Sequence, residues 1–118
     1  MLPSRAKNRI KGRTGEALAI CYLKNNNIKV LETNYTNAIG EIDIIAKDND
    51  NRILFIEVKM RSSANFGYPR EAVNYKKQQK IRRVAELYLK INHLIDAYTR
   101  FDVIEILGDN ITHIKAAF

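Results

Sequence analysis

The sequence lacks a second cysteine, a long apolar run and any internal repeat. Cys21 stands alone and cannot form an internal disulfide bond, which excludes the disulfide-rich secreted domains and is typical of a reducing compartment. The longest clean apolar run, from Ala17 to Leu23, is far shorter than the roughly 20 residues that cross a bilayer. No cysteine–histidine spacing resembles a zinc site, and His93, near a helix end, and His113, in a late strand, are expected to have surface or capping roles.

Residues 1–13 carry five basic residues and no acid, which slightly resembles a leader segment. However, Glu16 precedes the apolar run and no small-residue cleavage site follows it. We therefore expect a cytoplasmic protein with no membrane partner. The chain divides into a basic N-terminal arm, residues 1–13, with little local drive to order, and a single domain, residues 14–118.

Positive charge is in excess: the net charge is +7 and the pI is near 9.6. Such an excess attracts polyanions through long-range attraction and counterion release, and nucleic acid is the commonest of them. A basic surface that is merely solvated is the alternative. The candidate phosphate contacts lie in the arm, after the third strand and on the second helix: Arg5, Lys7, Arg9, Lys11, Arg13, Arg61, Lys76, Lys77 and Lys80.

Hydrophobic periodicity and turn residues predict the element order αβββαββ. Thr14 is the expected N-cap of the first helix, and the turn at residues 48–51 predicts that the second and third strands are antiparallel neighbours. The long crossover through the second helix predicts an α/β fold with a mixed central sheet flanked by helices. The predicted helices span residues 14–26 and 70–92, and the predicted strands span 28–35, 41–47, 52–60, 100–107 and 111–115.

Charged residues interrupt two of the apolar strands. Alternation in residues 53–59 places Glu57 and Lys59 on one face with Ile53 and Phe55, and such charges are costly to bury unless they pair or coordinate a ligand. On the neighbouring strand, Ile42, Ile44 and Ala46 share one face, and Asp43 lies on the opposite face, although aspartate is disfavoured in strands. The hairpin register brings Asp43 roughly across from Glu57, so that two carboxylates and one lysine converge.

This set of residues is sufficient for phosphodiester hydrolysis. The carboxylates of Asp43 and Glu57, with the carbonyl oxygen of Val58, offer hard oxygen ligands to Mg²⁺ or Mn²⁺. Such an ion acidifies water and neutralises charge on the phosphate, and Lys59 can position the water or stabilise the same charge. An edge-strand ion pair between Glu57 and Lys59 is the alternative. Asp102 lies inside an apolar strand and is expected to pair with Arg100 or Arg61.

Five motifs follow one another along nearly the whole chain: GRTGEA at residues 12–17, NY at 34–35, GEIDIIA at 40–46, FIEVKMR at 55–61 and RFDV at 100–103. Together they resemble the YraN family, which is similar in fold to restriction endonucleases and archaeal Holliday-junction resolvases. The resemblance implies a restriction-endonuclease-like core and a nuclease site of the PD-(D/E)xK type.

Carried over residue by residue, the resemblance implies that Asp43 is the motif acid and that Glu57 and Lys59 form the ExK pair. It also implies that Glu16 is the helix-borne acid of resolvase-like members. From the residues alone, Glu16 is equally a partner of the positive helix N-terminus. The sequence departs from the pattern at Ile42, where the motif's name has proline.

The first functional hypothesis is a Mg²⁺- or Mn²⁺-dependent endonuclease that hydrolyses structured or single-stranded DNA. The second is a non-catalytic nucleic-acid-binding module with the same fold, and the third is a protein that binds another acidic partner. Resolvase-like relatives cut two strands by pairing two copies, so the resemblance also suggests a homodimer. Phe66, Tyr68 and Phe118 are the candidate interface residues, unless these rings cover their own core.

Overall fold

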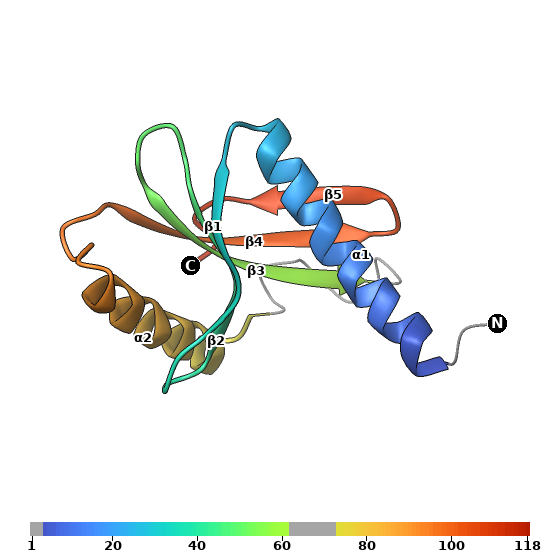
Figure 1. Ribbon diagram of the computed structural model, residues 1–118, viewed down its shortest axis with the longest axis horizontal. Coiled ribbons are helices and arrows are strands. Elements are labelled where there is room, and N and C mark those ends of the chain that lie inside the picture. The colour runs from blue at the N-terminus through green and yellow to red at the C-terminus, as the bar shows by residue number, and fades with distance from the viewer. Residues whose placement is uncertain (1–3, 62–72) are drawn as a thin grey trace.

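The computed structural model describes residues 4–61 and 73–118, with residues 4–14 described only as helix backbone. Its order of elements, αβββαββ, is the predicted one (Figure 1). No helix in the described part of the chain is long and apolar enough to cross a membrane. The elements are α1 (Ser4–Asn25), β1 (Lys29–Thr36), β2 (Glu41–Lys47), β3 (Ile53–Arg61), α2 (Tyr75–Ile91), β4 (Thr99–Leu107) and β5 (Asn110–Ile114).

The two helices begin at different residues from those predicted. Thr14 is not an N-cap, because α1 already begins at Ser4. Residues 4–13 are mostly good helix formers, and the cost of Gly12, about 1 kcal/mol, does not stop a helix that is already propagating. The second helix begins at Tyr75, because the Asn74 side chain caps it by accepting a hydrogen bond from Lys77 N at 2.9 Å.

The five strands form one mixed sheet in the order β1-β2-β3-β4-β5. Neighbouring strands are antiparallel except for β3 and β4, which are parallel and are joined by the α2 crossover. The prediction that the second and third strands form an antiparallel hairpin is confirmed. The strongly apolar strand β3 is central, as its composition predicted.

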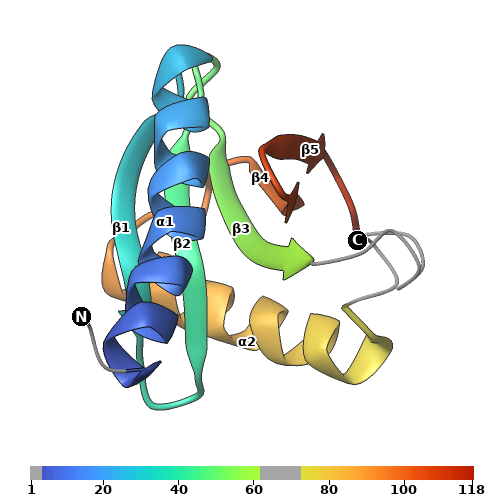
Figure 2. The ribbon, with the colours of Figure 1, turned by 90° about the vertical axis from the view of Figure 1, so that its right-hand side faces the viewer.

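Two apolar clusters lie on opposite faces of the sheet, one under α1 and one under α2 (Figure 2). The strict alternation predicted for β2 fails at one point. Ile44 and Ala46 pack in the α1 cluster, as expected, but Ile42 packs in the α2 cluster beside Ile45. The ladder between β2 and β3 ends at the pair Ile44–Ile56, but Ile42 still pairs with Tyr35 of β1. The alternation of β2 breaks at Asp43, opposite Asn34, whose left-handed backbone makes β1 irregular at the same point.

A buried polar network on the α1 side joins α1, β4 and β5. The fully buried carboxylate of Asp102 accepts hydrogen bonds from Arg100 Nε and Nη2, each at 2.9 Å, and from Ala116 N at 3.0 Å. His113 Nε2 lies 2.8 Å from Asp102 Oδ2, and the Tyr22 hydroxyl lies 3.1 Å from His113 Nδ1. The pairing predicted for Asp102 with Arg100 is confirmed, whereas the surface position predicted for His113 is wrong, since its side chain is 3% exposed.

The C-terminal aromatic ring covers the protein's own core. Phe118 stacks on Phe101 with 5.4 Å between ring centroids, and the Arg82 guanidinium lies over both rings. Of the three aromatic residues considered for a dimer interface, Phe118 is therefore engaged within the chain. Phe66 and Tyr68 lie outside the described residues.

Candidate functional site

The candidate site lies where β2 and β3 part. Their ladder ends at Ile44 and Ile56, and the same register carried one residue further places Asp43 opposite Glu57. At that point the side chain of Asp43 bridges the strands, because its Oδ2 accepts a hydrogen bond from Val58 N at 2.8 Å. We call Asp43, Glu57 and Val58 the strand fork.

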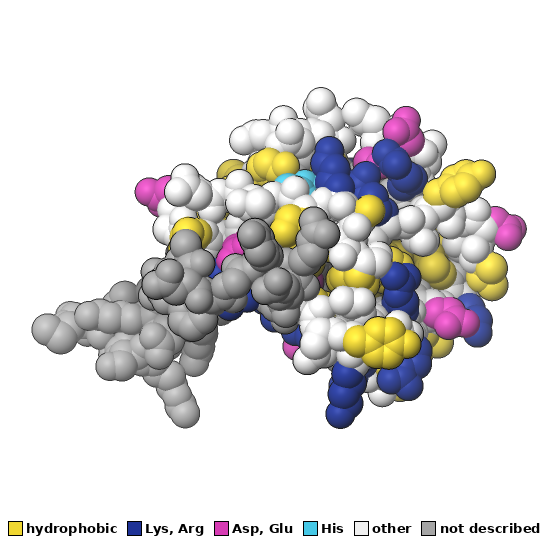
Figure 3. Space-filling model, turned by 180° about the vertical axis from the view of Figure 1, so that it is seen from behind, with side chains coloured by type: hydrophobic (Ala, Val, Ile, Leu, Met, Phe, Trp, Pro, Cys, Tyr) yellow, Lys and Arg dark blue, Asp and Glu magenta, His cyan; other side chains and the backbone are white. Residues whose placement is uncertain are grey.

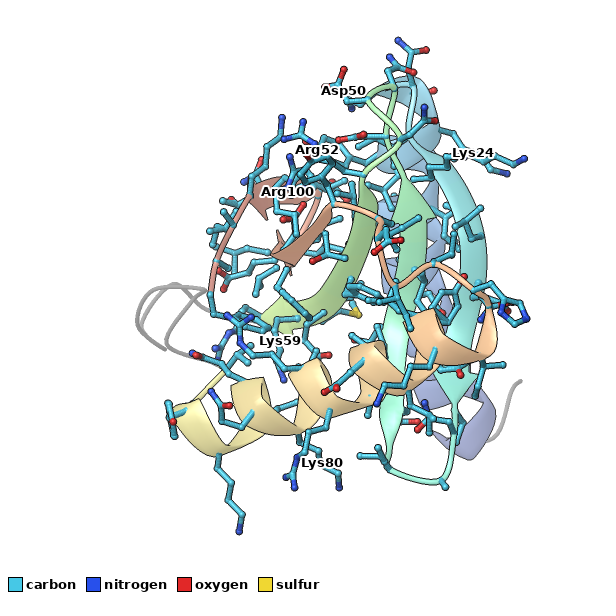
Figure 4. The ribbon with its side chains drawn as sticks, turned by 90° about the vertical axis from the view of Figure 1, so that its left-hand side faces the viewer. Lys24, Asp50, Arg52, Lys59, Lys80 and Arg100 are labelled. Carbon is cyan, nitrogen blue, oxygen red and sulfur yellow. The ribbon has the colours of Figure 1, made fainter. Side chains whose placement is uncertain are left out.

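Two lysines from different elements bind the acid of β3. Glu57 is 8% exposed, and its Oε1 lies 2.7 Å from Lys77 Nζ and 3.5 Å from Lys59 Nζ. Lys59 reaches Glu57 from β3 itself and Lys77 from the first turn of α2. In Figure 4, Lys59 lies between β3 and α2, whereas Lys80 extends from the far side of α2. Glu57, the buried acid of the predicted ExK pair, is thus bound by Lys59 of its own strand and by Lys77 of α2.

In the strand fork, the negative charge of Glu57 disfavours the ionised form of Asp43. Burial, followed by the negative charge of Glu57, raises the pKa of the Asp43 carboxyl to about 6. Burial, followed by the nearby Lys77 ammonium, lowers the pKa of Lys59. Burial alone would lower the pKa of Lys77 as well, but the hydrogen bond to Glu57 raises it overall. A further positive charge near Asp43 would therefore be stabilising.

A hollow of about 250 Å³ opens beside Asp43 on the α1 side, and we call it the carboxylate hollow. It brings the acid predicted on the first helix to the site, where Glu16 Oε1 accepts a hydrogen bond from Asn34 Nδ2 at 2.8 Å. Because α1 begins at Ser4, Glu16 lies well past the first turn, and the alternative role as a partner of the helix N-terminus loses its basis. The lining residues are Glu16, Asn34, Asp43, Val58 and Met60.

The strand fork fits a small, hard cation. Asp43 and Glu57 are oxygen ligands from neighbouring strands, and Mg²⁺ is commonly held by one or two carboxylates together with waters and substrate phosphates. Burial and the negative charge of Glu57 raise the pKa of Asp43, and a cation bound beside Asp43 would favour its ionised form. Among the described residues, no group of three or more His, Cys, Asp and Glu side chains is placed to hold a metal ion. The strand fork offers two side-chain carboxylates, so an ion there would need further ligands from water, backbone or phosphate oxygens.

The predicted phosphate contacts differ in exposure and in whether they lie close to an acidic side chain. Lys76 and Lys80 are exposed on α2, and Lys and Arg side chains are visible on the lower part of the face in Figure 3, where α2 lies. Lys77 is bound to Glu57, and Arg61 Nε lies 3.3 Å from Glu105 Oε1. The side chains of the remaining candidates lie outside the described residues: Arg5, Lys7, Arg9, Lys11 and Arg13.

Sequence reasoning missed Asn34, and it predicted Lys77 only as a phosphate contact. The contact between Lys77 and Glu57 could have been found from helical spacing, because Lys77 shares the buried stripe of α2 with Ile81, Val84 and Tyr88. Asn34 gave a weaker signal. It has a positive φ of 50° inside β1, a conformation in which asparagine is enriched, and sequence alone does not place that strand beside Glu16.

Comparison with known proteins identifies the family. Residues 15–106 match the model of "Uncharacterised protein family UPF0102". A UPF0102 protein of Acetivibrio thermocellus is 51% identical over 108 residues, which cover 87% of this chain and 82% of the relative. A UPF0102 protein of Clostridioides difficile is 50% identical over 113 residues, covering 94% of this chain and 98% of the relative. The predicted resemblance is confirmed, and the chain belongs to the UPF0102 family, also called the YraN family.

Proposed function

We propose that the chain is a divalent-metal-dependent endonuclease that hydrolyses phosphodiesters of structured or single-stranded DNA. The observation that carries the proposal is the strand fork: Asp43 and Glu57 meet at the open end of a hairpin, with Lys59 beside them. Two carboxylates and a lysine in one place are sufficient for metal-assisted phosphodiester hydrolysis. The element order and mixed sheet agree with the endonuclease-like core that the family resemblance implies.

Each residue of the site has a part that follows from its surroundings. Asp43 and Glu57, with the carbonyl oxygen of Val58, would hold Mg²⁺ or Mn²⁺, which supplies positive charge to the phosphate and lowers the pKa of water. Lys59 is 25% exposed and its pKa is lowered, so it can donate a hydrogen bond to the attacking water or to a phosphate oxygen. Glu16 lines the carboxylate hollow beside Asp43, where it can orient water.

The test is a nuclease screen of the purified chain over several DNA shapes, with and without Mn²⁺. We expect cleavage or nicking with Mn²⁺ only. Lys59→Ala should lower the rate by at least about 100-fold, because it removes one charge-stabilising group from the site. The variant also controls for a contaminating nuclease, since equal rates for it and the wild type would assign the cleavage to another protein.

The second candidate function is a DNA-binding module without catalysis. The observation that favours it is the absence, among described residues, of a third metal-ligating side chain grouped with Asp43 and Glu57. The two candidates differ in one measurement. Calorimetric titration with Mn²⁺ should give heat of binding for the endonuclease and none for the module, while both should bind DNA.

DNA binding should depend on the exposed basic face of α2. We expect Lys76→Ala with Lys80→Ala to weaken binding about equally for all sequences, because these side chains offer phosphate contacts without base readout. The slope of log affinity against log salt should fall by about one for each lysine removed. The matched control is Lys24→Ala, which removes a charge from the exposed end of α1. An unchanged slope in the double variant would place the DNA elsewhere on the surface.

A further inference from the structure

Lys77 holds the acid of the candidate site more closely than the predicted catalytic lysine does. Its Nζ lies 2.7 Å from Glu57 Oε1, compared with 3.5 Å for Lys59 Nζ. The bond is short enough to be a strong charge-assisted hydrogen bond, and it forms at an acid whose side chain is only 9% exposed. A cation supplied by the chain itself thus lies on one of the two carboxylates that would hold a metal ion.

Lys77 also lines a second cavity, which shares no described lining residue with the carboxylate hollow. A groove of about 390 Å³ runs between α2 and the turn that joins β1 to β2, and we call it the α2 groove. The turn approaches α2 closely, because a Cβ on Gly40 would lie 3.0 Å from Lys80 Cε. The groove is lined by Thr36, Gly40, Glu41, Lys77, Lys80 and Ile81.

The side chain of Lys77 has room to leave Glu57. It is 42% exposed, far more than the acid it binds, and its stem starts in the first turn of α2, whose backbone is fixed by the Asn74 cap. Rotation about the side-chain bonds can therefore carry the ammonium from Glu57 into the α2 groove without moving the helix. There it would lie beside Lys80, and two ammonium groups side by side favour a phosphate between them.

We propose that Lys77 is an exchangeable internal cation: it occupies the cation position on Glu57 in the metal-free protein and moves to a DNA phosphate in the α2 groove when a divalent ion takes that position. The inference rests on the proposed function and assigns to Lys77 a part that the predicted site did not contain. The exchange replaces the single positive charge of Lys77 on Glu57 by the double charge of the ion. Glu57 keeps a positive partner at every stage, and the released ammonium is available only when the metal is in place.

The proposed exchange predicts different effects of replacing Lys77 and of replacing its sequence neighbour Lys76. Lys77→Met removes the competitor for Glu57, so we expect Mn²⁺ to bind about tenfold more tightly than to the wild type. In the chelated, metal-free protein the same variant should lose little DNA affinity, because Lys77 is then engaged by Glu57. Lys76→Met removes an equal charge from an exposed position one residue away. It should leave Mn²⁺ affinity within about twofold, since a remote charge is screened, and should weaken DNA binding.

The experiment is calorimetric titration of Mn²⁺ into the metal-free chain, with DNA binding measured by fluorescence anisotropy in a chelator. Lys77→Arg keeps the cation and should keep the wild-type Mn²⁺ affinity or lower it. Lys77→Gln is the second neutral variant, for use if Lys77→Met does not fold by circular dichroism. Tighter Mn²⁺ binding by the neutral variants alone supports the exchange. Equal Mn²⁺ affinities for Lys77→Met and Lys76→Met overturn it and leave the nuclease proposal standing, whereas no Mn²⁺ binding by any protein overturns both.

Discussion

Asp43→Asn is expected to reduce Mn²⁺-dependent cleavage to background while making the protein more stable at pH 8. The loss of rate should be on the order of 10⁴-fold or more, because in the proposed endonuclease the variant would remove one of two anionic ligands of an ion that would supply several kcal/mol to the transition state. The free energy of unfolding should rise by about 1–3 kcal/mol, since each unit by which burial and Glu57 raise the pKa of Asp43 is worth ~1.4 kcal/mol. The amide oxygen of asparagine can still accept from Val58 N.

The stability gain has a defined dependence on pH. The pKa of Asp43 is about 6 in the folded protein and near its ordinary value of 3.8 in the unfolded chain. Between these values the unfolded chain has released the proton that the folded chain retains, so wild-type stability falls as the pH rises from about 4 to about 6 and then levels off. Urea denaturation should therefore show the variant and the wild type diverging over that range.

Asp96→Asn is the matched control, because it makes the same chemical change at an exposed position in the loop after α2. Cleavage and stability should both stay at the wild-type level. Metal-dependent cleavage by Asp43→Asn at more than about a tenth of the wild-type rate would remove Asp43 from the site, whatever its effect on stability.

Asp102→Ala should have the largest effect on stability, a loss of about 3–5 kcal/mol in the free energy of unfolding. The substitution leaves the Arg100 guanidinium, His113 and the Ala116 N–H without the carboxylate that they share. Since a domain is stable by only about 5–15 kcal/mol in total, the variant should unfold at a much lower urea concentration. Circular dichroism during urea denaturation is the measurement.

The effect of replacing Asp102 should become smaller in acid. Burial alone would raise the pKa of Asp102, but hydrogen bonds from His113 and Arg100 outweigh it and lower the pKa overall. A carboxyl whose folded pKa is depressed stabilises the fold above its unfolded value and loses that contribution as the pH falls through the folded value. The difference between variant and wild type should therefore shrink below about pH 4.

Asp50→Ala is the comparison for Asp102→Ala, since its side chain is 77% exposed and its pairing with Arg52 is solvated. It should cost no more than about 1 kcal/mol. A loss of that small size for Asp102→Ala would show that the buried network can rearrange around a missing acid.

Periodicity predicted most of the fold because most strands are buried on defined faces. Residues 53–59 alternate without interruption, and the structure places Phe55 under α2 and Leu54 under α1 as that alternation requires. The face of Ile42 was predicted wrongly because the alternation of β2 breaks at Asp43, which lies opposite the left-handed Asn34 of β1 and beyond the end of the β2–β3 ladder. The start of α1 was predicted wrongly because Gly12 and a plausible cap at Thr14 are weak signals for a helix start, and they do not stop a helix that already extends from Ser4.

The candidate site was predicted as far as charged residues stand out inside apolar strands. Asp43, Glu57 and Lys59 do so, and hairpin register brings the two acids to one end of the sheet. Lys77 and Asn34 do not, because lysine on a basic helix and asparagine near a turn are ordinary. Their roles depend on contacts between segments far apart in sequence, Asn34 with Glu16 and Lys77 with Glu57, which local sequence patterns do not predict.

The irregular backbone of β1 has a consequence for assembly. β1 is an outer strand of the sheet, its pairing with β2 shifts register between Val30 and Glu32, and Asn34 has a left-handed conformation. A second polypeptide that sought to continue the sheet there would meet a broken row of donors and acceptors, which opposes fibril-like stacking and strand exchange between molecules. Two copies that come together at this edge would have to recognise each other through side chains.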